Sequence, residues 1–210
     1  MAATVARVLA LFWLATSACQ AAEPSPTPAP SAPASPAATP SPAVTPTPSP
    51  SPSDSGAVGA VVELASRPAL FIEGKATREE VYGAILGNLA KLRDAAAKAG
   101  LKPQGHALAV FLAADDDGFT YRAMVPLESA PDPKLALPDA IKSGQTPVGK
   151  AMKFEHRGEY DDIDSTYDAI TAYLDEKGVD AQDVFVEEYL NEPKTSDDPN
   201  GQVDIFVLTR

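Results

Sequence analysis

Prolines are crowded into one short part of this sequence. Twelve of the 21 prolines lie between Pro24 and Pro52, and the other nine are scattered over the rest of the chain. Residues 23–55 are otherwise almost entirely Ala, Ser and Thr, so they have too few large apolar side chains to compensate for the entropy lost on folding. We therefore expect a disordered linker at 23–55, extended as polyproline II. A proline-rich docking ligand is the alternative.

The chain before this linker contains an apolar run. Residues 8–18 follow Arg7 and are too few to span a bilayer as a helix. The length of the run and the small residues after it predict a signal peptide at 1–22 and an exported protein, periplasmic or extracellular. Cleavage to a soluble form is favoured over lipidation of Cys19, because Thr16 stands where lipoproteins usually have leucine. A lipid anchor at Cys19 is the only membrane contact expected, and a buried core helix is the alternative for this run.

The composition of the remaining chain excludes several classes of protein. Cys19 is the only cysteine, which excludes a disulfide framework and thiolate metal clusters. His106 and His156 are the only histidines, so a histidine-built metal site is not expected. From Gly56 onward there are 27 acidic and 16 basic residues, which leaves little positive charge to neutralise phosphates. We expect no metal, no cofactor and no nucleic-acid partner.

Two helices are predicted in residues 56–210. Thr77 and Glu80 have the spacing of a capping box, and Gly100 suits a helix C-terminus. Acidic residues at 161–164 suit the start of the second helix, and Gly178 suits its end. Between these limits apolar residues recur at helical spacing: Tyr82, Ile85, Leu86, Leu89 and Leu92 in the first helix, and Ile163, Tyr167, Ile170 and Leu174 in the second.

Strand-like runs surround the two helices. They cover 61–64, 69–73, 106–113, 119–127, 148–156, 183–190 and 203–209. The order strand, helix, strand, strand therefore occurs twice, and 100–111 is similar to 178–189 at an offset of 78 residues. We predict an α+β fold with a duplicated β-α-β-β repeat, about 60–129 and 146–210, joined by a loop at 130–144. A monomer is expected, since one chain already supplies both halves.

One strand carries the most informative side chains. Side chains alternate across a strand, so Phe185, Glu187 and Tyr189 share one face while Val186 and Glu188 lie on the other. A buried carboxylate between aromatic rings is unfavourable unless it is paired, protonated or facing a ligand. A cation held between these groups would be favourable. The alternative is that Glu187 points to water.

Other motifs carry less information. Residues 115–118, Asp-Asp-Asp-Gly, resemble the start of a calcium loop. They lack the downstream glutamate and lie between two strands, which indicates a hairpin turn. The sequence has no G-x-S-x-G, phosphate loop or H-E-x-x-H.

The C-terminal part of the sequence resembles a known family. The motif His156-Arg157-Gly158-Glu159-Tyr160, the helix after it and the segment 186–193 (Val-Glu-Glu-Tyr-Leu-Asn-Glu-Pro) resemble the GyrI-like domain. This is the effector-binding domain also found in AraC- and MerR-type regulators, and the resemblance covers about 61–210. The sequence departs from the usual family pattern at Glu159, Val186 and Glu192, where proline, arginine and aspartate are common, and 56–210 lacks tryptophan.

The resemblance implies a curved antiparallel sheet with two main helices around a concave ligand pocket. Glu187 matches the pocket glutamate that meets cationic, amphipathic ligands in the family. Tyr189 matches the tyrosine two residues further on, and Tyr160 matches the tyrosine of the first motif. Together with Phe185, and with Phe111 as the repeat counterpart of Tyr189, these are the expected ligand-binding residues.

Three functions are compatible with this sequence. The leading hypothesis is an exported protein that binds a cationic or amphipathic small molecule, without a DNA-binding domain because the first 55 residues hold no helix-turn-helix. The second is a small-molecule hydrolase in which Glu187 is the general acid or base and Tyr189 or Tyr160 bonds the substrate; binding without turnover is favoured. The third is a protein-interaction module on a spacer, which predicts an exposed apolar patch and no enclosed pocket.

Overall fold

The computed structural model of the chain describes residues 59–115 and 117–210. The signal peptide expected at 1–22, with Cys19, and the linker expected at 23–55 lie outside the described residues and stay predictions.

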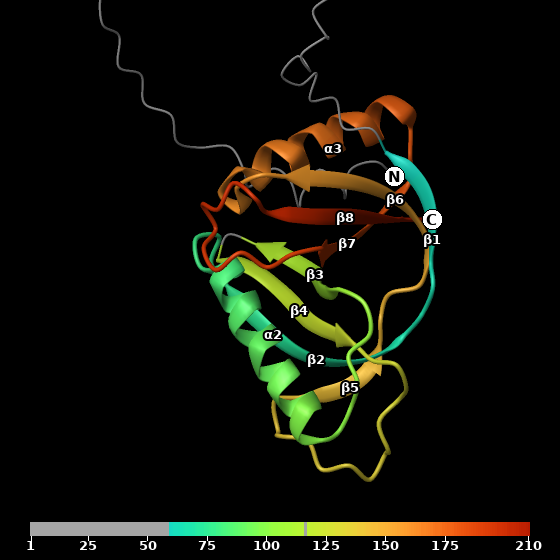
Figure 1. Ribbon diagram of the computed structural model, residues 1–210. Helices are drawn as coiled ribbons and strands as arrows, with labels where there is room; N and C mark the ends of the chain where they lie inside the picture. Colours follow the sequence, from blue (N-terminus) through green and yellow to red (C-terminus); the bar gives the residue numbers. More distant parts are fainter. Residues whose placement is uncertain (1–58, 116) are drawn as a thin grey trace, which may run out of the picture. The chain divides into compact units, whose positions relative to one another are not determined.

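The described residues form a set of strands, two α-helices and one short 3-10 helix (Figure 1). The strands are β1 Ala60–Leu64, β2 Pro68–Ala76, β3 Ala107–Asp115, β4 Gly118–Pro126, β5 Lys142–Gln145, β6 Gly149–Arg157, β7 Ala181–Tyr189 and β8 Gln202–Thr209. The helices are α2 Val81–Lys98, the 3-10 helix η2 Tyr160–Asp162 and α3 Ile163–Lys177.

All of these strands belong to one antiparallel sheet, in the order β1-β6-β8-β7-β3-β4-β2-β5. The order is symmetric, because exchanging β1–β4 with β5–β8 reverses it. Strands β3 and β7 meet at the centre, where Ala109 pairs with Glu187. Figure 1 shows the curvature of the sheet. The predicted α+β fold, with a curved antiparallel sheet and two main helices, is confirmed.

The first strand of each half pairs with the other half of the sheet. Strand β1 pairs with β6, and β5 pairs with β2. The connections that follow these strands contact each other: the Arg67 N–H donates to Thr146 Oγ1 at 3.0 Å, and the Thr146 N–H donates to the Arg67 carbonyl at 2.8 Å. The two halves are interlocked, so side chains that meet at the central strands are held by one common framework.

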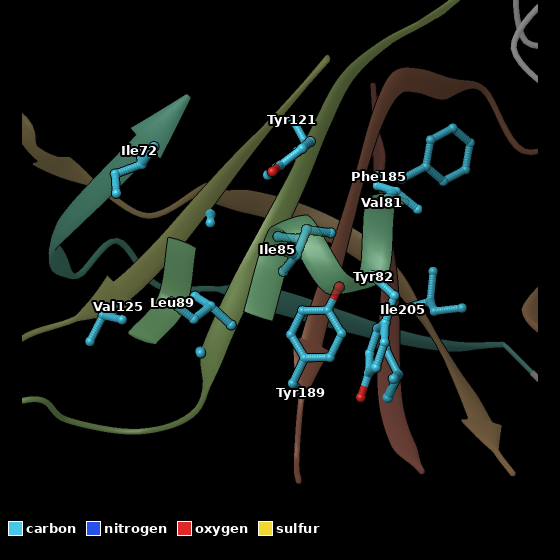
Figure 2. Close-up of a cluster of buried hydrophobic side chains, with 14 of the residues drawn as sticks. Ile72, Val81, Tyr82, Ile85, Leu89, Tyr121, Val125, Phe185, Tyr189 and Ile205 are labelled. Carbon is cyan, nitrogen blue, oxygen red and sulfur yellow. The ribbon is translucent and has the colours of Figure 1, made fainter. Parts of the chain in front are cut away.

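Both helices cover the same face of the sheet. Helix α2 packs against β2 and β4, and α3 packs against β6. Leu89 and Ile170 of their apolar stripes are fully buried in the main core. Figure 2 shows part of this core, where Tyr82 of α2 lies beside Tyr189 of β7 with ring centroids 6.4 Å apart. The opposite face of the sheet carries a separate apolar cluster around Val186.

The start of the first helix differs from its prediction, while its end agrees. Helix α2 begins at Val81, because the Glu80 N–H bonds to the Thr77 carbonyl at 3.3 Å and closes a turn. The Thr77 hydroxyl donates to the Glu80 carboxylate instead of capping the helix. At the other end Gly100 has φ 68°, and the Leu101 N–H bonds to the Ala96 carbonyl, as in a Schellman motif.

Two connections can also be compared with their predictions. The loop expected at 130–144 ends in strand β5, which pairs with the free edge of β2. The segment Lys-Ser-Gly-Gln has no apolar alternation, so only its tertiary pairing makes it a strand. The hairpin turn expected after Asp115 is confirmed, since Asp115 pairs with Gly118 where β3 and β4 meet. Gly118 has φ 130°, which disfavours any side chain at this position.

Candidate functional site

A cavity of about 330 Å³ lies over the central strands of the sheet. Its walls come from both halves of the fold: β3, β4 and the turn before α2 in the first half, and η2, α3 and β7 in the second. The lining includes Arg78, Phe111, Phe119, Tyr160, Asp164, Tyr167, Asp183, Phe185 and Glu187. A pocket built from both halves agrees with the predicted concave site.

Strand β7 places Glu187 in the wall of this cavity. The alternation along the strand holds, because Phe185 and Tyr189 pack in the main core while Val186 packs in the cluster on the opposite face. Glu187 has 1% of its surface exposed. Within the described part of the chain, no lysine, arginine or histidine forms an ion pair with its carboxylate.

Three tyrosine hydroxyls hold the Glu187 carboxylate. Tyr167 donates to Oε1 at 2.7 Å, Tyr189 donates to Oε2 at 2.7 Å and Tyr160 donates to Oε2 at 3.0 Å. The donors come from three separate elements, α3, β7 and η2. Since an ionised carboxylate offers about four lone-pair sites, these hydroxyls leave little capacity for a further strong donor.

Burial dominates the electrostatics of this cluster. Burial raises the pKa of Glu187 above its usual value, although the three hydroxyl groups act in the opposite direction. Burial and the neighbouring carboxylate raise the pKa values of Tyr160, Tyr167 and Tyr189 well above 10, so these hydroxyls stay protonated and remain donors. An ionised Glu187 is therefore hydrogen-bonded but electrically uncompensated, and a cation in the cavity would compensate it.

A buried histidine fixes the turn that carries Tyr160. The Nε2 atom of His156 donates to the Glu159 carbonyl at 2.9 Å, so Nδ1 accepts from the Thr166 hydroxyl at 2.8 Å. Burial lowers the pKa of His156, which favours this neutral form. The ring thereby ties η2 to α3 next to Tyr160. Tyr160 also stacks on Tyr82 of α2, with centroids 4.4 Å apart.

Aromatic rings form the apolar walls of the cavity. Phe111 pairs with Phe185 across β3 and β7, and its ring meets Phe119 edge to face with centroids 5.7 Å apart. The ring of Tyr167 meets Phe185 in the same manner, also at 5.7 Å. Aromatic faces next to a carboxylate suit an organic cation better than an anion.

An ion pair joins the two halves beside the cavity. Arg78, in the turn before α2, contacts Asp164 of α3 at 2.8 Å. The Arg78 guanidinium also lies 5.8 Å from the ring centroid of Phe119. The remaining charged groups of the lining, Glu79, Asp161, Asp183 and Glu187, are all acidic. The lining is therefore negative overall.

Four of the five predicted ligand-binding residues line the cavity. They are Phe111, Tyr160, Phe185 and Glu187. Tyr189 is placed differently: it lies behind Glu187 with 1% of its surface exposed and contacts the carboxylate instead of the cavity. Phe111 has the place expected of the repeat counterpart of Tyr189. The pairs Ala107–Tyr189 and Phe111–Phe185 exchange when each residue is shifted by the offset of 78 residues between the repeats.

Sequence reasoning missed Tyr167 and Arg78. Tyr167 lies in the apolar stripe of its helix, where a tyrosine is indistinguishable from a core residue. Its position two turns before Leu174 on the buried side of the helix was the one available signal. Arg78 and its partner Asp164 are 86 residues apart, and no local pattern connects them.

The described residues show neither a metal centre nor a membrane-spanning helix. Residues 59–115 and 117–210 hold no group of three or more His, Cys, Asp or Glu side chains placed to bind a metal ion. Within the same ranges, no helix is long and apolar enough to cross a membrane.

The sequence identifies the family to which this fold and pocket belong. Residues 60–209 match the family described as the GyrI-like small molecule binding domain. The match covers most of the chain, so the protein belongs to the GyrI-like family of small-molecule-binding domains. A search of the curated proteins found no match.

Solved structures of similar fold include EcmrR, alone as a C-terminal domain and in a complex with DNA, and a hydrolase. The isolated C-terminal domain of EcmrR has a TM-score of 0.61 at 13% identity, covering 73% of this chain and 98% of that domain. EcmrR in a complex with DNA has the same TM-score and identity. That match covers 74% of this chain but only 59% of the EcmrR chain. A hydrolase encoded by lin2189 from Listeria innocua has a TM-score of 0.54 at 10% identity, covering 72% of this chain and 91% of that one. At these identities the likeness establishes the fold alone.

Proposed function

We propose that this protein binds a small organic cation, with the ionised Glu187 carboxylate as the counter-charge. One observation carries the proposal: a buried carboxylate in a cavity wall accepts three tyrosine hydroxyl bonds, yet has no ion-pair partner among the described residues. Keeping a buried carboxylate ionised costs desolvation free energy, unless a ligand supplies the missing positive charge. The aromatic rings of Phe111, Phe185 and Tyr167 supply an apolar and cation-attracting surface beside it.

The net charge of the lining supports a cation over an anion. The acidic side chains of the lining outnumber its single basic side chain, Arg78, which already contacts Asp164. An anion would therefore meet Glu187 and several other carboxylates at short range in a poorly solvated space. A neutral apolar ligand would leave the Glu187 charge uncompensated.

Hydrolysis is a second candidate function. The raised pKa of Glu187 suits a general acid or base, which is the observation in its favour. However, the hydroxyl groups of Tyr160, Tyr167 and Tyr189 all donate to Glu187, so they are not oriented to polarise a substrate carbonyl. Binding without turnover therefore has the stronger support. An interaction module without an enclosed pocket has less, given the cavity.

We further propose that the domain acts as an exported monomer. Export rests on the sequence of residues 1–55 alone, and an intact-mass measurement of the protein from its native cells tests it. A mass matching loss of about 20 residues supports export, and an uncleaved chain contradicts it. The monomer is supported by the cavity, whose wall is completed by both halves of one chain.

Calorimetry with aromatic quaternary cations tests the binding proposal. Phenyltrimethylammonium and related benzylammonium cations are titrated into the wild-type chain, Glu187→Gln and Glu188→Gln. Glu188 is the matched control, because it lies next to Glu187 on the opposite face, where it pairs with Arg67. We expect binding to the wild type and to Glu188→Gln, and at least a tenfold loss in Glu187→Gln, which is about 1.4 kcal/mol. Equal affinities in the two variants, or no binding of any cation at millimolar concentration, would overturn the proposal.

A further inference from the structure

The cavity continues along β7 beyond Glu187, and a second carboxylate lies in its wall. Three lining residues of this strand, Asp183, Phe185 and Glu187, follow at intervals of two. On β3 the opposing residues are Ala109 at Glu187 and Phe111 at Phe185. The lining of β3 then continues to Ala113 and Ala114. The floor of the cavity is therefore acidic at Glu187, aromatic in the middle and acidic again at Asp183.

The two carboxylates differ in what they can still accept. Glu187 already receives three hydroxyl donors, so it favours a cation that is held by charge and not by N–H bonds. Asp183 has the opposite property: its Oδ1 atom is buried and has no hydrogen-bond partner among the described residues. Buried carboxylate oxygens normally accept a hydrogen bond, and this one accepts none. A ligand can supply the missing donor once the carboxylate turns toward it.

The spacing of the two acidic groups limits the length of such a ligand. Four strand residues span at most about 13 Å when fully extended. The register of β7 shifts between Ala181 and Phe185, so the strand is locally bent and the real separation is shorter. An eight-carbon chain is long enough to connect the two ends over the rings of Phe111 and Phe185.

We infer that the ligand of this cavity is an elongated dication, with an onium group lacking N–H donors at Glu187 and a primary or secondary ammonium group at Asp183. An ammonium group carries the N–H donors that Asp183 Oδ1 lacks, and its charge offsets a second acidic group. This inference rests on the proposed function, because it assumes that the onium end binds at Glu187.

Three compounds that differ only at one end test the inference. Octyltrimethylammonium, (8-hydroxyoctyl)trimethylammonium and (8-aminooctyl)trimethylammonium are titrated into the wild-type chain. We expect the amino compound to bind at least about tenfold more tightly than the octyl compound, which is about 1.4 kcal/mol. The hydroxy compound should lie close to the octyl compound, because it offers a hydrogen bond without charge.

The variant Asp183→Asn identifies the residue that causes the difference. It should reduce the ratio between the amino and octyl affinities from about ten to near one. Asp180→Asn is the matched control, because Asp180 is an exposed aspartate nearby that pairs with Arg210 instead of lining the cavity. This control should keep the wild-type ratio. An unchanged ratio in Asp183→Asn, or a ratio near one in the wild type, would overturn the inference.

The same data separate this inference from the proposed function. If octyltrimethylammonium binds and Glu187→Gln weakens it, while the amino group adds nothing, then only the dication inference is wrong. If none of the three compounds binds the wild type, or Glu187→Gln changes no affinity, then the proposed function is wrong and the dication inference is wrong with it.

Discussion

The hydroxyl of Tyr167 lies 2.7 Å from Oε1 of Glu187 and joins helix α3 to the central strand β7. It is the hydroxyl that bonds this carboxylate oxygen, while Tyr160 and Tyr189 both bond Oε2. The hydrogen bonds that stabilise the charge of Glu187 therefore come from three elements of the fold. A movement of α3 relative to the sheet would change the stability of that charge.

Removing the Tyr167 hydroxyl should change the ionisation of Glu187. A hydrogen bond to a charged group contributes about 1.5–3 kcal/mol, so Tyr167→Phe should raise the pKa of Glu187 further. We expect cation binding in this variant to disappear at a higher pH than in the wild type, measured by calorimetry over a pH series. Tyr173→Phe on the same helix is the control, because Tyr173 packs edge to face on Phe154 away from Glu187. A Tyr167→Phe profile that coincides with the wild type would contradict the prediction.

Cation binding should depend on pH in one direction. Burial raises the pKa of Glu187 above 4.5, and only the ionised form carries the counter-charge. Affinity should be constant above this raised pKa and should decrease about tenfold per pH unit below it. Glu187→Gln should show a flat profile over the same range. An affinity that increases toward low pH would show that another group controls binding.

Glu187 should reduce the stability of the ligand-free protein at neutral pH. Its folded-state pKa is raised, so the native state holds the proton more tightly than the unfolded state does. The stability linked to this proton is present below pH 4.5 and is lost as the pH rises through the folded-state pKa. Urea unfolding at pH 8 should therefore show Glu187→Gln more stable than the wild type by roughly 0.5–2 kcal/mol. The difference should shrink toward pH 4, and a difference that grows at low pH would refute this account.

Two glycine substitutions should have opposite effects on stability. At Gly118 a Cβ atom would lie 2.2 Å from the Ala76 carbonyl oxygen, and φ is 130°. Gly118→Ala should therefore destabilise the β3–β4 hairpin by about 2 kcal/mol or more. Gly87→Ala is the matched comparison at an exposed position of helix α2, where a Cβ atom meets nothing within 4 Å and should stabilise by about 0.5–1 kcal/mol. Thermal unfolding of both variants measures this, and equal effects would contradict the hairpin geometry.

Local patterns predicted the parts of the molecule that depend on neighbouring residues. Period-two alternation placed Glu187 on the face of Phe185 and Tyr189, and glycine chemistry placed the end of α2 at Gly100. The duplicated order of elements predicted two similar halves, which the structure has, and the family resemblance implied the curved sheet. These features follow from backbone geometry, which short segments of sequence encode.

Contacts between distant segments could not be predicted in this way. The bond between Tyr167 and Glu187 depends on how α3 is rotated over β7, and the Arg78–Asp164 pair depends on how the two halves meet. Strand β5 exists only because β2 offers a free edge. Tyr189 lies on the predicted face of its strand, but the other tyrosines and Glu187 cover its ring. It is therefore not part of the cavity lining.

The most direct test of the central claim compares two molecules of the same shape. Phenyltrimethylammonium and tert-butylbenzene differ in charge and hardly in volume, so their affinities for the wild-type chain at pH 8 separate charge recognition from apolar filling of the cavity. If the ionised Glu187 is the counter-charge, the cation should bind at least about tenfold more tightly than the neutral hydrocarbon, which is about 1.4 kcal/mol. Equal affinities, or tighter binding of tert-butylbenzene, would contradict the account.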